Sequence, residues 1–272
     1  VGISKWNANG ENTLTVDGGS NLTIVGVAQN NGLIEAMAAD LNGVAVGVVV
    51  SSSSRATFSI NGGSSVTILG HASSGGDNND TAIRAGTSHA ANSKYVASVG
   101  IAVCSSNSHS KLGMSENSSL TIKGEVADGG RIEAAVAQEV AAAVGVVVFS
   151  ELFTSTSSFD IFTNSSVAII GSASTSNTTN ININDTNNNG NGNGNGAAIL
   201  ASSEFTAAAV AIAVWAPSQV YISVTGKSKA TVTGHAASEG TMITAIANLA
   251  AAASVGIVGV SLTSLPRCLD RK

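Results

Sequence analysis

Few residues of this chain could take part in catalysis, and they do not form a recognisable set. His71 and His235 occupy equivalent places in two internal repeats, but the same place in the other copies holds valine, glutamate or serine. Glu35 and Glu133 share a second such place with arginine, leucine and threonine. The sequence shows no paired carboxylates, no metal-spaced histidines and no nucleophile elbow. We therefore expect a protein that is not an enzyme and that uses no cofactor or metal.

Two residue types could be modified covalently. Cys104 follows a valine-rich run, and Cys268 lies in a basic tail that contains a proline. In a secreted protein they could form a disulfide within the chain or between subunits; the alternative is one buried thiol and one incidental thiol in the tail. Asn-x-Ser/Thr sequons permit N-glycosylation. They begin at Asn21, Asn79, Asn117, Asn164, Asn177 and Asn184.

The elements that must position these residues belong to one pattern of four blocks that recurs five times. The most regular feature is a glycine within a short apolar segment, as in LTIVGVA and VTILGHA. These repeat-defining glycines are Gly26, Gly70, Gly124, Gly171 and Gly234. Repetition at a period of about 44 residues or more is typical of stacked, solenoid architectures.

All four blocks are predicted to be β-strands. Apolar residues alternate with threonine, serine and small residues, and β-branched residues dominate three of the blocks. The third block, for example residues 132–139, has good helix propensity, but its Ile-x-Ala alternation recurs in every copy and favours a strand. The predicted fold class is all-β: a β-solenoid, or parallel β-helix, of five four-strand repeats with a small-residue core. The pattern does not decide between one wide coil and two narrow coils per repeat.

The repeats account for most of the chain. We expect an N-terminal leader over residues 1–11, a solenoid over 12–262, an Asn/Gly-rich loop insertion over 174–196 and a C-terminal tail over 263–272. The repeats are assigned to residues 12–55, 56–109, 110–156, 157–219 and 220–262. The inserted loop cannot bury apolar area to offset its ordering entropy, so it is expected to be an excursion from the solenoid.

The amino-acid composition is more typical of a protein that self-assembles than of an enzyme. Charged residues make up 11% and aromatic residues 4% of the 272 residues, less than a globular enzyme usually has. The net charge of −5 argues against a nucleic-acid partner, and no apolar run is long enough for membrane insertion. A chain that starts at Val1 without methionine fits a processed, secreted product.

The order of a valine-rich run, a Ser/Thr-rich turn, a short apolar strand and an Ile-x-Ala strand resembles the repeats of large secreted bacterial exoproteins. The nearest are filamentous-haemagglutinin-like adhesins and leukotoxin-type repeat proteins. The pattern covers residues 12 to about 262 and is carried by stretches such as Val44–Val50, Ser51–Ile60, Ser65–Gly70 and Ile83–Ala85. The resemblance implies a right-handed β-solenoid with an extracellular surface or adhesive role. This chain is much shorter than those proteins.

Three functions follow, in decreasing order of support. The first is a secreted structural protein of the cell surface whose last repeat stacks on the first repeat of another copy, because open solenoid ends expose unpaired strand edges. Such stacking would build a filament, fibre or sheath. The second is a fragment of a surface adhesin or toxin that binds a glycan or a host protein through the loops after Gly70 and Gly171. The third is a polysaccharide-active β-helix enzyme.

Overall fold

The regular elements of the structure are parallel β-strands that recur in a fixed order of four. The structure, a computed structural model, describes residues 1–30, 32–38, 42–73, 81–87, 95–135, 140–152, 154–174, 198–203, 206–237, 241–247 and 251–261. Within these ranges all elements are strands, and no helix is long and apolar enough to cross a membrane. The all-β prediction is confirmed.

Strand β1 (Gly2–Asn7) precedes five coils of four strands each. The first coil contains β2 (Asn12–Val16), β3 (Asn21–Gln29), β4 (Leu33–Ala38) and β5 (Asn42–Ser52). The second contains β6 (Arg55–Ile60), β7 (Ser65–Ser73), β8 (Ala82–Thr87) and β9 (Tyr95–Ser105). The third contains β10 (His109–Met114), β11 (Ser119–Ala127), β12 (Arg131–Ala135) and β13 (Val140–Ser150). The fourth contains β14 (Thr156–Ile161), β15 (Ser166–Ser174), β16 (Ala198–Ser203) and β17 (Thr206–Ala216), and the fifth β18 (Gln219–Val224), β19 (Lys229–Ala236), β20 (Met242–Ala247) and β21 (Ala251–Ser261).

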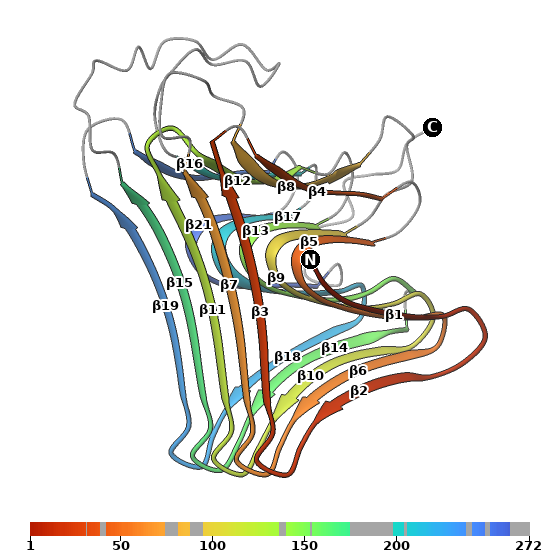
Figure 1. The fold of residues 1–272 in the computed structure, drawn as a ribbon. Coiled ribbons are helices and arrows are strands. Elements are labelled where there is room, and N and C mark those ends of the chain that lie inside the picture. Colours follow the sequence, from red (N-terminus) through yellow and green to blue (C-terminus); the bar gives the residue numbers. More distant parts are fainter. Residues whose placement is uncertain are drawn as a thin grey trace, which may run out of the picture.

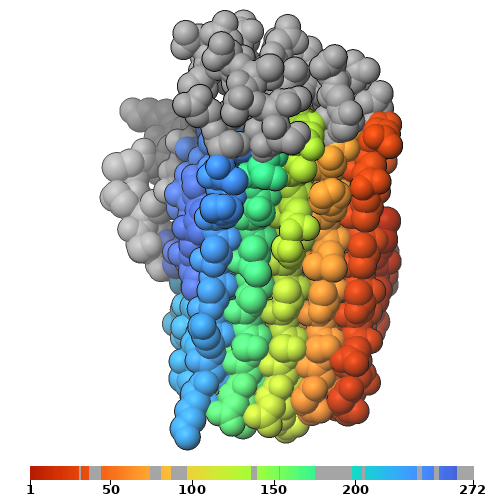
Figure 2. Space-filling view, turned by 60° about the vertical axis from the view of Figure 1, so that its left-hand side comes forward, coloured from red at the N-terminus to blue at the C-terminus, as the bar shows by residue number. Residues whose placement is uncertain are grey.

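Each strand pairs with its counterpart in the neighbouring coils, and the pairs build four parallel sheets (Figure 1). Sheet A has the order β1-β5-β9-β13-β17-β21, and sheet B the order β2-β6-β10-β14-β18. Sheet C has the order β3-β7-β11-β15-β19, and sheet D the order β4-β8-β12-β16-β20. Figure 2 shows sheet C from outside, with the strands of the five coils side by side in chain order. Since a strand meets its counterpart one repeat later, each repeat forms one wide coil.

The alternating blocks form strands because one of their faces is buried. Along β7 and β11 buried residues alternate strictly with half-buried ones, the period of two expected for a half-buried strand. The third block is a strand in all five coils, as β12 illustrates. Residues 136–139 of that block lie outside the described part of the chain.

The repeat-defining glycines form one column across sheet C, because each is the register partner of the next. Glycine is needed there for space. A Cβ atom on Gly124 would lie 2.3 Å from Cγ2 of Val144 in sheet A and 3.1 Å from Cδ1 of Ile132 in sheet D. The other four glycines face the equivalent valines at 2.2 or 2.3 Å. The column therefore marks where the backbone of sheet C contacts valine side chains of sheet A.

Sheet A bends sharply halfway along its strands, and the outside of the bend faces sheet C (Figure 1). A column at the bend contains the corner glycines Gly47, Gly100, Gly145 and Gly256, with φ of 150°, 157°, 151° and 153°, and the fourth coil has Ala211 at this position. A Cβ atom on Gly100 would lie 1.8 Å from the carbonyl oxygen of Gly145, so glycine lets successive coils approach. Two residues before each corner position, one residue of the strand has no register partner. Ala143 is an example, because it lies between the paired residues Ala142 and Val144.

The bend gives the molecule two apolar clusters. The larger one fills the space between the four sheets, and its bulkiest members include Phe58, Leu112 and Phe159 on sheet B. The second lies on the other face of sheet A, where the rings of Phe149 and Trp215 stack with centroids 4.2 Å apart. Strands β13 and β17 are consequently buried at every residue. A strand covered on both faces needs the continuous apolar sequence that these strands have.

Candidate functional site

The histidines that share a repeat position lie on the outer face of sheet C. His71 and His235 belong to a column that also contains Val27, Glu125 and Ser172. Nδ1 of His71 lies 3.9 Å from Oε2 of Glu125, whose Oε1 lies 2.5 Å from Nζ of Lys123. All three side chains are partly solvated, and the fourth coil separates His235 from Glu125. Such exposed ion pairs contribute little and form no enclosed site.

The two glutamates that share a position lie on the outer face of sheet D, one coil either side of Arg84. Nε of Arg84 lies 3.5 Å from Oε2 of Glu133. Arg84 therefore lies between Glu35 and Glu133 in the ladder, and the structure brings the two carboxylates onto one face without a direct contact between them. Asp160 on sheet B is likewise paired, with Nζ of Lys111 at 3.2 Å.

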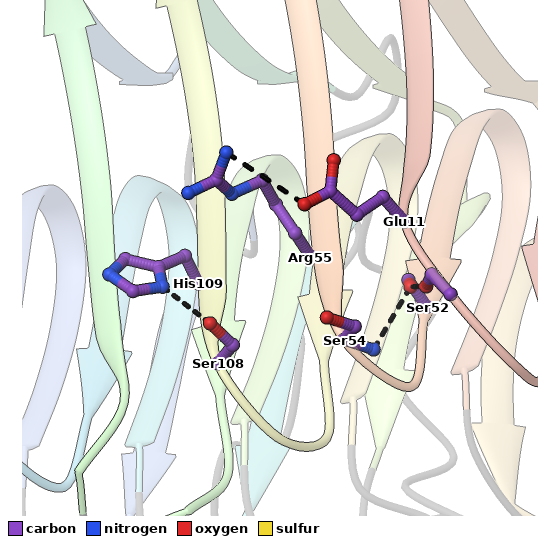
Figure 3. A network of polar contacts seen from close by, with 7 residues as sticks. Glu11, Ser52, Ser54, Arg55, Ser108 and His109 are labelled. Atoms are coloured by element: carbon purple, nitrogen blue, oxygen red, sulfur yellow. Dashed lines mark hydrogen bonds and ion pairs between the residues drawn. The ribbon is translucent and has the colours of Figure 1, made fainter.

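A further group of polar side chains lies at the corner between sheets A and B (Figure 3). His109 is the register partner of Arg55. Its Nδ1 lies 2.5 Å from Oγ of Ser108, while Nη1 of Arg55 is 4.0 Å from Oε1 of Glu11. The carboxylate of Glu11 thus pairs with Arg55, and no carboxylate contact orients His109 beside Ser108 among these residues. This corner therefore does not have the order of a catalytic triad. In the described part of the chain, no three His, Cys, Asp or Glu side chains lie close enough to hold a metal ion.

Cys104 is 1% exposed and lies in the second apolar cluster, in the column that holds Ser51, Phe149 and Trp215. That position buries the thiol inside the bend of sheet A. Cys268 lies outside the described residues, so the disulfide stays a prediction.

Three of the predicted glycosylation sites can be placed, and all three are exposed. Asn117 and Asn164 lie in the stacked turns between sheets B and C, with φ of 60° and 59°. Asn21 begins β3, and its Oδ1 accepts a hydrogen bond of 2.5 Å from Oγ of Ser65. Asn79, Asn177 and Asn184 lie outside the described residues. The placed sites are thus accessible to a glycan-transferring enzyme, but whether they are modified stays a prediction.

Sequence reasoning missed a buried serine network at the corner between sheets A and B. Oγ of Ser105 lies 3.1 Å from Oγ of Ser150, and Ser110 donates to Ser105 over 3.0 Å. Ser157 donates to Ser150 over 3.1 Å. Each hydroxyl has a partner in its own coil or the next, so the network satisfies polar groups that burial would otherwise penalise. Its role is structural.

The surface that stands out is the end formed by the fifth coil. Among the described strands, β18, β19, β20 and β21 each have a partner on one side only. Inward side chains that would be covered by another coil are therefore partly open: Ile222 (38% exposed), Val224 (39%), Val255 (43%) and Ile257 (45%). Their counterparts one coil earlier are fully buried at 0%: Phe159, Ile161, Val210 and Ile212. We call this surface the fifth-coil end.

The opposite surface, the first-coil end, is different. Strands β2, β3 and β4 again have one described partner each, but β1 pairs with the second half of β5, from Gly47 to Ser52. Val48 and Val50 are consequently 0% exposed. Lys5 of β1 stands in the column of Val50. Its Nζ donates a 2.5 Å hydrogen bond to the carbonyl oxygen of Thr13.

Comparison of the chain with protein-family models, with curated proteins and with solved structures finds no match. The geometry of the two ends must therefore carry the functional argument.

Proposed function

We propose that this protein is an extracellular structural protein whose solenoids associate end to end into a filament, fibre or sheath. The observation that carries the proposal is the fifth-coil end, where four inward apolar side chains are 38% to 45% exposed. An apolar surface bordered by unpaired parallel edges is favourable to cover, because association removes apolar area from water and pairs the free backbone groups.

The occupant that fits this end is the first coil of another copy. Every coil of the chain already stacks on its neighbour through the same inward columns, so the fifth and first coils carry matching faces. Ile222 would cover Leu14, and Gly234 would lie over Gly26 in the column where sheets C and A touch. A head-to-tail contact of this kind does not close on itself and therefore propagates.

An extracellular location is supported by the exposure of Asn21, Asn117 and Asn164, and by the resemblance to the repeats of secreted exoproteins. The low content of charged residues limits repulsion between like molecules, which suits a chain that assembles. The loops through which an adhesin fragment would bind a glycan or a host protein lie outside the described residues. No described feature favours that second function over assembly.

The proposal is tested by one pair of substitutions in the fifth coil. Ile257 points into the stack, whereas Ile246 on β20 lies in the outward column of Ser202 and is 58% exposed. Ile257→Lys places a charge at the contact, and the lysine stem can reach solvent in the isolated chain. Ile246→Lys introduces the same charge at an outward position on a neighbouring strand.

Sedimentation velocity over a concentration series, with negative-stain imaging, is the measurement. The wild-type protein and Ile246→Lys should form lengthening assemblies, and Ile257→Lys should remain monomeric. A wild-type chain that stays monomeric at every concentration, or equal assembly of both lysine variants, would contradict the proposal. Circular dichroism establishes that both variants keep their β-sheet content.

A further inference from the structure

Strand β1 imitates the second half of a sheet A strand. Its Gly2 pairs with Gly47 and has φ of 152°, the conformation of the corner glycines. A Cβ atom on Gly2 would lie 1.9 Å from the carbonyl oxygen of Gly47, as close as between coils inside the stack. Ile3 continues the inward column of Val48 and packs against the larger apolar cluster. Thus β1 occupies the place that part of a preceding coil would take.

We propose that the edge of β5 now covered by β1 is the docking surface for β21 of a second copy, and that β1 must leave before end-to-end stacking occurs. This inference rests on the proposed function. By column, Val255 would lie over Val46 and Gly256 over Gly47. The second half of β21 and β1 compete for the same backbone groups of β5, because one strand edge accepts one parallel partner.

The geometry of the other three sheets requires the same displacement. The edges of β2, β3 and β4 lie in the layer of β5, whereas β1 lies one layer further out. While β1 remains in place, β21 of a second copy can come no closer than the outer edge of β1. Sheets B, C and D of the two copies would then be separated by one extra strand spacing of about 4.8 Å and could not pair.

Lys5 adds an electrostatic reason for the displacement. It stands in an inward column where the coils below contribute Val50 and Val103. A second copy stacked on β1 would enclose this ammonium group, and an inward-pointing charge on an edge strand is a device that prevents edge-to-edge pairing. Release of β1 removes Lys5 from the interface between the two copies. Val50 would then lie beside Gly259 of the second copy.

The contacts of β1 are suited to reversible release. The strand pairs over six residues and on one edge. Its largest side chain, Trp6, is 62% exposed. Segments with few buried contacts open at a small fraction of the global unfolding free energy. A closed state with β1 bound and a minor open state with β1 released therefore give a switch whose population sets the apparent affinity of stacking.

The test compares two valine substitutions within β1. Gly2→Val introduces a side chain where a Cβ atom would lie 1.9 Å from the carbonyl oxygen of Gly47, so the backbone of β1 must change there and its pairing with β5 is weakened. Ser4→Val, the matched control, changes a residue paired with Val49 in a column that accepts valine. The critical concentration for assembly, measured by light scattering and sedimentation, should fall roughly tenfold or more for Gly2→Val, because the competing state is removed. It should not fall for Ser4→Val.

Two further variants make the outcome decisive. Deleting residues 1–7 removes β1 without any clash and should reproduce the effect of Gly2→Val, which guards against a folding defect in the substituted chain. Adding Ile257→Lys to the deletion should abolish assembly. The wild type, Gly2→Val and the deletion could all assemble at the same critical concentration, with Ile257→Lys preventing assembly of each. In that case displacement of β1 is wrong, but end-to-end stacking of the solenoids is retained. If none of them assembles, the proposed function itself fails.

Discussion

Equivalent inward residues are more buried at the first-coil end than at the fifth-coil end, and sheet A shows this most clearly. Val48 and Ile257 are equivalent residues of the first and fifth coils, yet Val48 is 0% exposed and Ile257 is 45% exposed. The difference comes from β1, which places Ile3 over Val48. A strand of six residues is thus enough to close one end of the most buried sheet. The other end offers the same column to solvent.

This contrast shows that a solenoid end is made adhesive or protected by what covers it. The inward columns themselves are nearly the same in every coil, so burial depends on position within the stack.

The largest difference is expected in the inward column of sheet B that contains Phe159 and Ile222. Phe159→Ala removes a fully buried ring and should lower the free energy of unfolding by about 4 kcal/mol through lost burial and a cavity. Ile222→Ala, one coil later, removes a side chain that is already partly solvated and should cost about 1 kcal/mol. Chemical denaturation of both variants in an Ile257→Lys background, which keeps the chains monomeric, measures this. Equal costs would mean that the fifth coil is covered in the monomer.

A second contrast lies in the repeat-defining glycines. Gly124→Ala forces a methyl group against Val144 and should lower stability by about 2–3 kcal/mol, because the packed interior cannot yield. Gly234→Ala meets Val255 at the same distance of 2.3 Å, but that valine is at the open end and can shift. The cost there should stay below about 1 kcal/mol. Thermal unfolding of the two variants provides the comparison, and similar losses would refute the openness of the fifth-coil end.

Deleting residues 1–7 should make the first-coil end resemble the fifth. Loss of β1 exposes Val48 and leaves the second half of β5 without a partner on that side. The expected cost is about 1–2 kcal/mol, the scale of one partly buried aliphatic side chain. In the Ile257→Lys background, which keeps the chains monomeric, hydrogen exchange at the amides of residues 48–52 should accelerate, while exchange at residues 258–261 should not change. Unchanged protection of β5 would show that β1 does not cover it in solution.

The smallest effect is expected in the stacked turns between sheets B and C, which are alike from end to end. Thr163 has φ of 54°, a left-handed conformation that is strained for a β-branched residue. Thr163→Gly should therefore stabilise the protein by about 1 kcal/mol. Lys227→Gly, with φ of 63° in the last coil, should have a smaller effect of the same sign because lysine is not β-branched. Destabilisation by either change, seen in thermal unfolding, would show that side-chain contacts of the turn outweigh strain.

Much of the fold could be predicted from the sequence because the repeats are local patterns. Alternation predicted the strands of sheets B, C and D, and the constant position of Gly70 and its equivalents defined the repeat. The contact of these glycines with sheet A is visible only in the structure. The pairing distance could not be predicted, since one wide coil and two narrow coils produce the same alternation. The strand pairs settle it in favour of one coil per repeat.

The bend of sheet A and the strand β1 were missed for different reasons. The bend leaves a signal, because β13 is apolar on both faces and has Gly145 near its middle, which a strand with one solvated face would not need. The role of β1 has almost no signal in the sequence. Its six residues show no distinctive pattern, and their register on β5 is a tertiary contact. Open ends with unpaired strand edges were therefore predicted from the sequence, but the asymmetry between them was not.

Cross-linking across the junction between two copies tests end-to-end stacking most directly. Thr231 and Thr23 belong to one outward column of sheet C, and stacking would place β19 beside β3. Neighbouring strands are about 4.8 Å apart, a separation that a disulfide can span. Chains with Thr231→Cys and chains with Thr23→Cys, both carrying Cys104→Ser and Cys268→Ser, are mixed and oxidised.

Covalent dimers containing one chain of each kind are the predicted result. Replacing Thr23→Cys by Thr121→Cys, in the same column but in the third coil, should abolish them. Absence of dimers from the first mixture, or an equal yield from both mixtures, would contradict stacking of the fifth coil on the first.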